Sequence, residues 1–283
     1  MSSIRIVTDS TCDLTSEQKA KYQITTIPLC IILEGASYYD GEDITPQEIF
    51  QWSDAYRTTP KTGAVPYDRS LQILTPFVEA GDEIIFFGIS SQMSDTCKII
   101  RRIADDLDYD KLHVIDSQNL STGMGIQAIY AAELAMQGKS VQEIIDLVEQ
   151  RRSKVYSSFI VDTLTYLSRG GRCSAATALF ANAFKFKPQI VVENGTMGVS
   201  KKFHGNQASV VIKYVKELEP LLKKADSTRI FVTHSCNDAT IVNAVVSYLN
   251  GLHHFKEVLV TNTGGVISSH CGPDTLGVMF YQN

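Results

Sequence analysis

Hydroxyl side chains gather at residues 89–96, directly after an uninterrupted apolar run at residues 84–88. The apolar run predicts a strand that is buried on both faces, and the polar segment stands where the chain must turn into a helix. In an open α/β sheet, ligands bind just past the carboxyl ends of such strands. Hydroxyls and free backbone N–H groups at a helix start suit a carboxylate or a phosphate. The segment therefore predicts an anion site, or a helix cap at Ser94 or Asp95, and the two are compatible.

Two other stretches carry side chains that suit an anionic ligand. Gly170 and Gly171 allow close approach of the backbone, and Arg172 adds a fixed charge with a forked set of donors. The alternative is the glycine end of a helix followed by a surface arginine. His270 ends an apolar step on a glycine-rich turn, and it either serves a site or bonds a loop carbonyl.

Motifs of common enzyme classes are weak or absent. Residues 123–128 match the dinucleotide pattern GxGxxA, but several residues separate them from the preceding strand, so we interpret these glycines as close helix packing. No Gly-Lys-Ser/Thr phosphate loop is present, which argues against a P-loop kinase. The start of the hydroxyl-rich segment resembles a nucleophile elbow without its second glycine. A serine esterase or thioesterase using Ser91 or Ser94 with His270 therefore stays open as an alternative.

The bulk properties exclude several classes of protein. The 283 residues include 44% hydrophobic residues, which suffices for one large or two modest domains. A net charge of −5 without a basic block argues against nucleic acid as the main partner. The six cysteines form no CxxC pair and the six histidines no HExxH motif, so neither a metal site nor a cofactor is expected. No signal peptide or membrane-spanning run is recognisable, and we expect a cytoplasmic protein.

The first half alternates strand and helix patterns. Strands are expected at residues 4–8, 24–33, 84–88 and 112–115, and the first, third and fourth end in Asp, Ser or Thr. Helices alternate with these strands. They are expected after a capping box at residues 15–18, from a proline-led start at residue 45, and near residues 70–78, 123–136 and 141–151. The helix at residues 123–136 is expected to be Ala-rich and amphipathic. Residues 58–66 read as a loop. The pattern predicts an α/β fold whose parallel sheet has helices on both faces, with the polar strand ends sharing one crevice.

The second half follows a different pattern. Asn194-Gly195 joins two strand-like segments and predicts a hairpin. Further strands are expected at residues 157–161, 229–234, 258–262 and 276–281, and helices at residues 175–185, 207–224 and 239–249. We therefore expect two domains, an N-terminal parallel-sheet domain at residues 1–154 and a C-terminal α/β domain with a mixed sheet at residues 155–283.

Taken together, these segments resemble the DegV family, most closely its fatty-acid-binding members. The matching motifs run the length of the chain in order: residues 8–14, 27–29 and 34–38, Lys61-Thr62-Gly63-Ala64, residues 89–96 and 114–117, Gly170-Gly171-Arg172, Lys187-Pro188, and residues 269–273.

The resemblance implies a two-domain fold with a long-chain fatty acid buried between the domains. It assigns the fatty-acid carboxylate to Thr62 and Ser94, with Ser91, Arg172 and His270 supporting the head-group site. Bacterial members act as lipid-binding carriers that present the fatty acid to a separate, dihydroxyacetone-kinase-like fatty acid kinase. That kinase forms an acyl-phosphate for phospholipid synthesis, and the carrier has no turnover of its own. Transient contact with a membrane surface also fits this role.

The tail of such a ligand should dominate its affinity. Burying an acyl chain contributes on the order of 0.8 kcal/mol per CH₂. The carboxylate contacts would then fix the register of the chain and the identity of the head group.

This sequence departs from the family pattern at several positions. Gly63 and Ala64 stand where the family usually has Ser-Gln. Gln92 and Asp95 replace two glycines, and helix capping is the expected role of Asp95. His204 replaces an arginine of members whose kinase contact is known.

Overall fold

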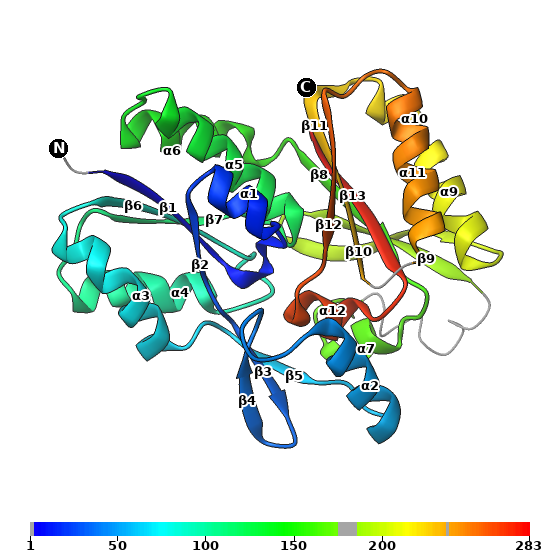
Figure 1. Cartoon of the computed structure of the whole chain (residues 1–283), viewed down its shortest axis with the longest axis horizontal. Helices are drawn as coiled ribbons and strands as arrows, with labels where there is room; N and C mark the ends of the chain where they lie inside the picture. The colour runs from blue at the N-terminus through cyan, green and yellow to red at the C-terminus, as the bar shows by residue number, and fades with distance from the viewer. Residues whose placement is uncertain (1–2, 175–185, 236–237) are drawn as a thin grey trace.

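The computed structural model describes residues 3–174, 186–235 and 238–283 of the chain. Its first half is built around a parallel four-stranded sheet in the order β2-β1-β6-β7 (Figure 1). Because the strands are parallel, their carboxyl ends share one edge, as the polar strand ends predicted. The strands are β1 (Ile4–Asp9), β2 (Ile24–Ile27), β6 (Glu83–Gly88) and β7 (Leu112–Asp116).

Helices cover both faces of this sheet, which confirms the predicted α/β arrangement. Alternate side chains of β6 point to opposite faces, so Ile85 and Phe87 belong to one core cluster and Ile84 and Phe86 to another. The capping box at Thr15 is confirmed. The helices of this half are the 3-10 turn η1 (Ser10–Cys12), α1 (Ser16–Lys21), α2 (Pro46–Tyr56), α3 (Tyr67–Glu79), α4 (Thr96–Asp106), α5 (Thr122–Met136) and α6 (Val141–Arg152).

Helix α5 is not amphipathic, so that part of the prediction was wrong. Most of its residues are buried, because α6, the parallel sheet and strands of the second half surround it. A Cβ at Gly123 would lie 2.1 Å from Asn119 Oδ1, and one at Gly125 would lie 2.8 Å from the backbone oxygen of Cys12. The two glycines therefore serve close packing, as interpreted from the sequence.

A small antiparallel sheet in the order β4-β3-β5 projects from the first half. Its third strand lies inside the segment expected to be a loop, so that expectation was wrong. The strand is only three residues long, too short to show a period, and it forms by pairing with β3, where Thr62 lies opposite Ile31. The strands are β3 (Cys30–Leu33), β4 (Ala36–Tyr39) and β5 (Lys61–Gly63).

The second half contains the expected mixed sheet, in the order β10-β9-β8-β13-β11-β12. Its β9–β10 hairpin turns at Asn194-Gly195 as predicted, and β12 runs parallel to β11 while the other pairs are antiparallel. The strands are β8 (Val155–Ile160), β9 (Lys187–Glu193), β10 (Thr196–Phe203), β11 (Ala225–Ser235), β12 (Glu257–Asn262) and β13 (Thr275–Gln282).

The helices of the second half differ from prediction at two places. The long helix expected at residues 207–224 is two helices that meet at Leu218. Pro220 has no backbone N–H and so cannot continue the hydrogen bonds of the first helix. Residues 265–271 form a helix where an apolar step and turn were expected. The helix expected at residues 175–185 lies outside the described residues. The described helices are α7 (Thr165–Gly170), α9 (Gln207–Glu217), α10 (Glu219–Leu222), α11 (Ala239–Gly251) and α12 (Gly265–Cys271).

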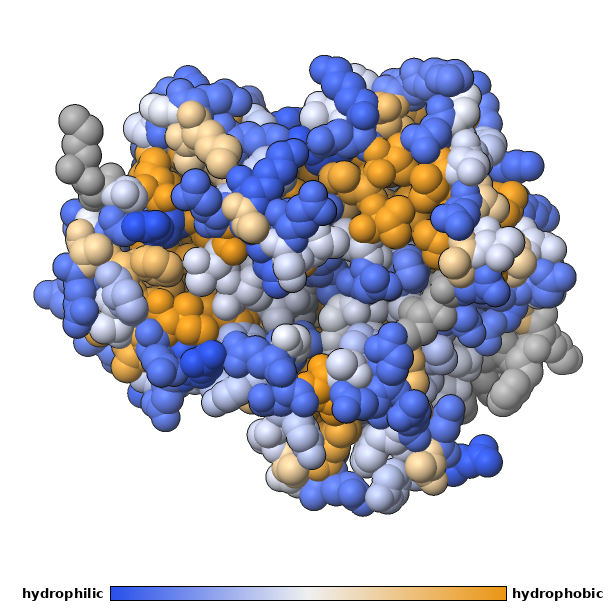
Figure 2. Space-filling model, viewed as in Figure 1, coloured by the Kyte–Doolittle hydropathy of each residue, from blue (hydrophilic) through white to orange (hydrophobic). Residues whose placement is uncertain are grey.

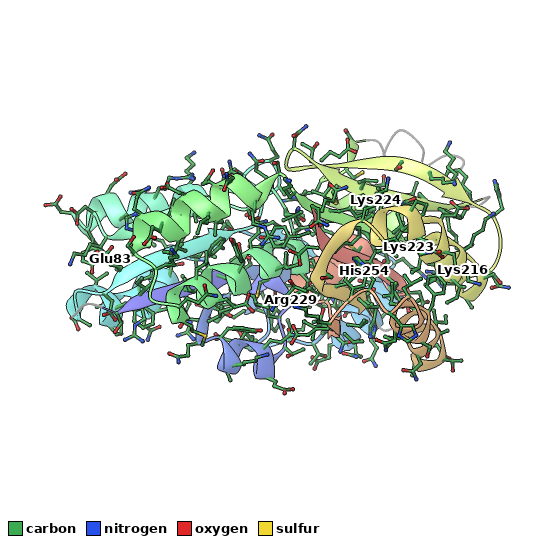
Figure 3. All side chains as sticks on the ribbon, turned by 90° about the horizontal axis from the view of Figure 1, so that it is seen from above. Glu83, Lys216, Lys223, Lys224, Arg229 and His254 are labelled. Atoms are coloured by element: carbon green, nitrogen blue, oxygen red, sulfur yellow. The ribbon has the colours of Figure 1, made fainter. Side chains whose placement is uncertain are left out.

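The two halves share a core and an ion pair. Phe231 and Met279 of the large sheet pack in the same cluster as α5. Arg229, which is 7% exposed, lies 3.1 Å from Glu133 Oε2 on α5. Seen from above, Arg229 lies in the middle of the molecule, between Glu83 toward one end and Lys216 toward the other (Figure 3).

The face shown in Figure 2 is mostly hydrophilic, with hydrophobic side chains gathered beside α11 and β12. Among the described residues, no helix has the length and apolar character needed to cross a membrane.

Candidate functional site

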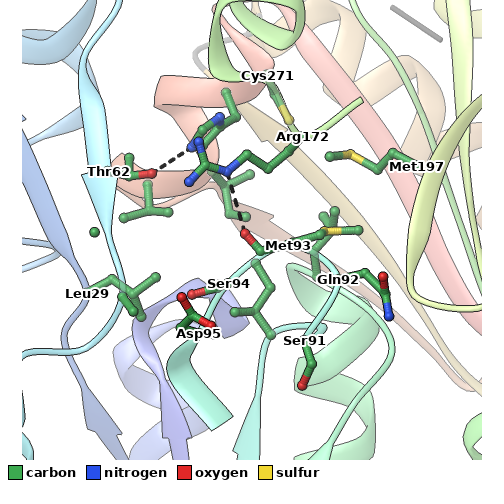
Figure 4. Close-up of a pocket in the computed structure, with 17 residues that line it drawn as sticks. Leu29, Thr62, Ser91, Gln92, Met93, Ser94, Asp95, Arg172, Met197 and Cys271 are labelled. Atoms are coloured by element: carbon green, nitrogen blue, oxygen red, sulfur yellow. Dashed lines mark hydrogen bonds between the residues drawn. The ribbon is translucent and has the colours of Figure 1, made fainter. Parts of the chain in front are cut away.

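A cavity of about 460 Å³ lies between the two halves, where the loop after β6 faces α12 (Figure 4). Its size falls in the range of about 300–1,000 Å³ that is usual for ligand pockets. Hydroxyl, imidazole and guanidinium groups line part of it, and apolar side chains line the rest. The lining residues are Leu29, Thr62, Gly63, Ala64, Ile89, Ser91, Gln92, Met93, Ser94, Asp95, Leu120, Arg172, Met197, Val266, Ile267, His270 and Cys271.

The loop after β6 is held by contacts on both sides. Asp9 Oδ2 accepts a hydrogen bond of 2.7 Å from the backbone N–H of Ile89. Ser90 Oγ donates to the backbone oxygen of Gly195, at the tip of the β9–β10 hairpin, over 2.7 Å. These contacts fix the segment that carries Ser91 and Ser94, both of which line the cavity.

The start of α4 is capped by Ser94, one of the two residues predicted to cap it. Ser94 Oγ accepts from the backbone N–H of Thr96 at 3.3 Å and lies 2.9 Å from the Thr96 hydroxyl. Asp95 occupies the N-cap position, but its side chain makes no capping hydrogen bond, so the capping role expected for it is wrong. Its carboxylate is exposed at the cavity, beside the serine (Figure 4).

Thr62 and His270 meet across the cavity wall, although 208 positions separate them in the chain. Thr62 Oγ1 and His270 Nε2 are 2.8 Å apart. The threonine is placed by the pairing of β5 with β3, and the histidine by the last turn of α12. The contact joins a strand of the first half to a helix of the second.

The imidazole of His270 is neutral at physiological pH. Burial lowers its pKa to about 4, and the charge of Arg172 adds to this shift. Its Nδ1 is buried and has no hydrogen-bond partner among the described residues. A Cβ at Gly170 would lie 2.2 Å from this nitrogen, so the ring rests directly against the α7 backbone.

Arg172 lines the cavity from the end of α7. Its Nη1 donates to the backbone oxygen of Gly170 at 2.7 Å, and its Nε donates to that of Met93 at 3.5 Å. Gly171, with φ of 69°, ends the helix in the left-handed region. The helix end predicted at these glycines is confirmed, and Arg172 lines the cavity, while its role toward an anionic ligand stays a prediction.

All five residues predicted for the site from the sequence line this one cavity. Their roles toward a ligand stay predictions. The apolar wall was not predicted residue by residue, because nothing distinguishes its side chains from core residues before the chain is folded. Its members are Leu29, Ile89, Met93, Leu120, Met197, Val266 and Ile267.

Comparison with known proteins places the chain in a family. The family model described as "Uncharacterised protein, DegV family" matches residues 3–283. The chain belongs to the DegV family. A DegV domain-containing protein of Clostridium acetobutylicum is 30% identical over 284 residues, covering 100% of this chain and 99% of the relative. One from Deinococcus radiodurans is 29% identical over 276 residues, covering 98% of this chain and 97% of that one.

Solved structures share this DegV architecture. A DegV family protein from Thermus thermophilus, described as fatty acid binding, is 27% identical with a TM-score of 0.89, covering 99% of this chain and 100% of that chain. DegV of Bacillus subtilis, described as a fatty acid binding protein, is 24% identical with a TM-score of 0.85 and coverage of 100% for both chains. At the lower identity the likeness establishes the fold alone.

Proposed function

We propose that this DegV family protein binds a long-chain fatty acid in the cavity between its two halves. The observation that carries the proposal is that the hydroxyls of Thr62, on β5, and Ser94, in the loop after β6, line one cavity together with an apolar wall. The likeness to the Thermus thermophilus protein supports the choice of ligand. Thr62 and Ser94 would hold the carboxylate, with Ser91, Arg172 and His270 supporting the head-group site.

The hydrogen-bond pattern suits a carboxylate. A neutral His270 that carries its proton on Nε2 donates to Thr62 Oγ1 and leaves the threonine hydroxyl proton for the ligand. When the Thr96 hydroxyl donates to Ser94 Oγ, the serine proton is likewise free to point at the ligand. Hydrogen bonds to a charged acceptor contribute about 1.5–3 kcal/mol each, so two hydroxyls hold a carboxylate without a full ion pair.

We further propose that the protein is a carrier that presents the carboxylate to a separate fatty acid kinase. The polar end of the cavity supports this role, because Ser91, Gln92 and Arg172 are exposed there and a partner can approach them. Residues 1–154 would form the domain with the carboxylate-binding loops, and residues 155–283 the domain that completes the acyl tunnel. The fatty acid would be acquired in transient contact with a membrane surface.

The contacts do not support the serine esterase alternative. Ser94 Oγ contacts the Thr96 hydroxyl, and His270 contacts Thr62 rather than a serine. Among the described residues, no carboxylate accepts from His270 Nδ1, so the base–acid pair of a hydrolytic triad is not assembled.

Native mass spectrometry of the purified protein, followed by denaturing extraction, tests the binding proposal. We expect one long-chain fatty acid for each chain. A protein that is empty and also takes up no added oleate would contradict it. Hydroxylamine trapping of acyl-phosphate tests the carrier role. Product is expected with ATP and a fatty acid kinase, and none with ATP and this protein alone.

The double variant Thr62→Val with Ser94→Ala tests the carboxylate site. Both changes nearly keep side-chain volume and remove the two hydroxyls, so we expect the oleate Kd to rise at least about tenfold. Thr75→Val is the matched control, because its hydroxyl donates to the Leu71 carbonyl on α3 and, among the described residues, Thr75 does not line the cavity. Equal affinity of the double variant and the control would refute the assignment.

A further inference from the structure

Three buried carboxyl groups lie together at the carboxyl edge of the parallel sheet. Asp9, Asp13 and Asp40 are 0%, 6% and 3% exposed, respectively. The first two belong to a polar strand end that the sequence singled out, yet none of the three lines the ligand cavity. Burying carboxyl groups is costly, so the contacts they make indicate what they do.

Two of these groups hold the first turn of α12. Asp13 Oδ1 accepts from the backbone N–H of Gly264, and Asp40 Oδ1 accepts from that of Gly265, both at 2.7 Å. Their second oxygens form hydrogen bonds with hydroxyls of the first half, Asp13 Oδ2 with Ser121 Oγ at 2.5 Å and Asp40 Oδ2 with Ser10 Oγ at 2.8 Å. Each carboxyl group therefore links a helix of the second half to a loop of the first.

The backbone around these contacts is tightly constrained. A Cβ at Gly265 would lie 2.5 Å from Ile31 Cδ1 and 2.9 Å from Ile49 Cδ1, so the helix start rests against β3 and α2. Ser121 has φ of 53° and ψ of −146°, a region that residues other than glycine rarely adopt. This strained backbone carries the hydroxyl that reaches Asp13.

Helix α12 in turn forms one wall of the ligand cavity. Val266, Ile267, His270 and Cys271 line the cavity, and the histidine contacts Thr62. The helix has only seven residues, so a displacement of its first turn carries the last turn with it. It lies between the two halves, next to α2 and α7 (Figure 1).

We propose that Asp13 and Asp40 are positioning residues for the ligand site, which act by clamping the start of α12 so that His270 meets Thr62 and the cavity wall closes. Neither side chain touches the ligand. The ligand readout below rests on the proposed fatty-acid binding, whereas the spectroscopic readout does not.

Alanine and asparagine variants at the two positions test the clamp. Asp13→Ala and Asp40→Ala remove the acceptors. Asp13→Asn and Asp40→Asn keep an oxygen for the glycine N–H and place an amide against the serine hydroxyl. Asp226→Ala is the matched control, because this half-buried carboxylate pairs with Arg151 at the other end of β11 from the site.

The first readout is the NMR signature of the His270 ring in ligand-free protein. In both alanine variants we expect the ring signals to shift and the titration midpoint to move up toward the ordinary value, because the ring leaves its buried place. The asparagine variants and Asp226→Ala should keep the wild-type signature. The second readout is the release rate of cis-parinaric acid, a fluorescent fatty acid, by stopped flow. We expect release at least tenfold faster in the alanine variants and within threefold of wild type in the asparagine variants.

Unchanged His270 signals and release rates in folded alanine variants would overturn the proposal. If an alanine variant does not fold, Ser10→Ala decides by the same readouts, because it leaves Asp40 in place and removes one of its donors. About threefold faster release with shifted His270 signals is expected there, and wild-type behaviour would overturn the clamp at Asp40. Shifted His270 signals in a protein that binds no fatty acid would refute the proposed function and leave the clamp standing.

Discussion

At the scale of single residues, the contact between Thr62 and His270 is one of the hydrogen bonds that join the two halves at the ligand site. Thr62 comes from a three-residue strand and His270 from a seven-residue helix, so neither is held by a long element of its own. What fixes the ring is its fit against the backbone at Gly170, where no side chain can be accommodated. The absence of a side chain at Gly170 is therefore required for this arrangement of the site.

Gly170→Ala should displace His270 and weaken ligand binding. The added methyl would lie 2.2 Å from Nδ1, so the ring must move and the bond to Thr62 is lost. We expect the oleate Kd to rise about tenfold, measured by titration. Gly251→Ala is the control, because this glycine is also helical and has nothing within 4 Å of its Cβ. Equal Kd values for the two variants would contradict the role of Gly170.

The polar site residues were predictable and the apolar ones were not. Thr62, Ser94 and His270 stand in motifs shared with the DegV family, and Ser94 and His270 also stood out in polar or glycine-rich turns. Met197 and Ile267 carry no such signal, since a cavity wall uses the same side chains as a core. Only the fold separates the two uses.

At the scale of elements, the tip of the β9–β10 hairpin in the second half supports the loop after β6 in the first half. The turn between β9 and β10 brings the Gly195 carbonyl to Ser90 Oγ, and this contact holds the loop that carries Ser94. Gly195 has φ of 78°, and a Cβ there would lie 2.6 Å from the serine hydroxyl. Residue 195 must therefore adopt a left-handed backbone conformation and carry no side chain.

Gly195→Ala should destabilise the protein and loosen the ligand site together. Gly35→Ala is the matched control, because it has φ of 87° but nothing within 4 Å of its Cβ. The left-handed conformation alone costs about 1–2 kcal/mol for alanine, so both variants should lose about that much in urea unfolding. Gly195→Ala should lose more free energy of unfolding than Gly35→Ala, because its methyl group also meets the Ser90 hydroxyl. Of the two variants, only Gly195→Ala should bind oleate more weakly. Equal losses with unchanged affinity would show that the hairpin tip does not support the loop.

The elements missed from the sequence are short and held by tertiary contacts. Helix α12 is rich in β-branched and serine residues, which favour helices weakly, so its pattern read as an apolar step and turn. Strand β5 exists because β3 offers it a pairing edge. Strands such as β6 were predictable because a continuous apolar run that ends in polar residues indicates a buried strand.

At the scale of the whole molecule, two sets of buried ionisable groups act on stability in opposite directions. Burial raises the pKa of Asp9 to about 6 and that of Asp13 to about 8, and burial lowers the pKa of His270 to about 4. The aspartates lie at the junction of the halves, and His270 lies in the last turn of α12, whose start Asp13 contacts. The protonation of these groups therefore affects the stability of the assembled molecule rather than that of either sheet alone.

The sign of each effect follows from where the proton is bound. Below about pH 4 Asp13 is protonated in both the folded and the unfolded chain, and its contribution to stability is fully present. As the pH rises toward 8 the unfolded chain releases this proton while the folded chain keeps it, so the free energy of unfolding falls. His270 acts oppositely, because its contribution is present above about pH 6.5 and is lost as the pH falls through about 4.

Between pH 6.5 and 8 the contribution of His270 is constant, so of these two groups only Asp13 changes the free energy of unfolding. We therefore expect the free energy of unfolding, from urea titrations, to fall over this interval by on the order of 1 kcal/mol. Asp13→Asn cannot release a proton, so its stability should change less over the same interval. All other titrating groups are common to both proteins, and comparing the two slopes removes their contribution. Parallel slopes for wild type and variant would show that Asp13 is already ionised at pH 6.5, and that the junction tolerates a buried negative charge.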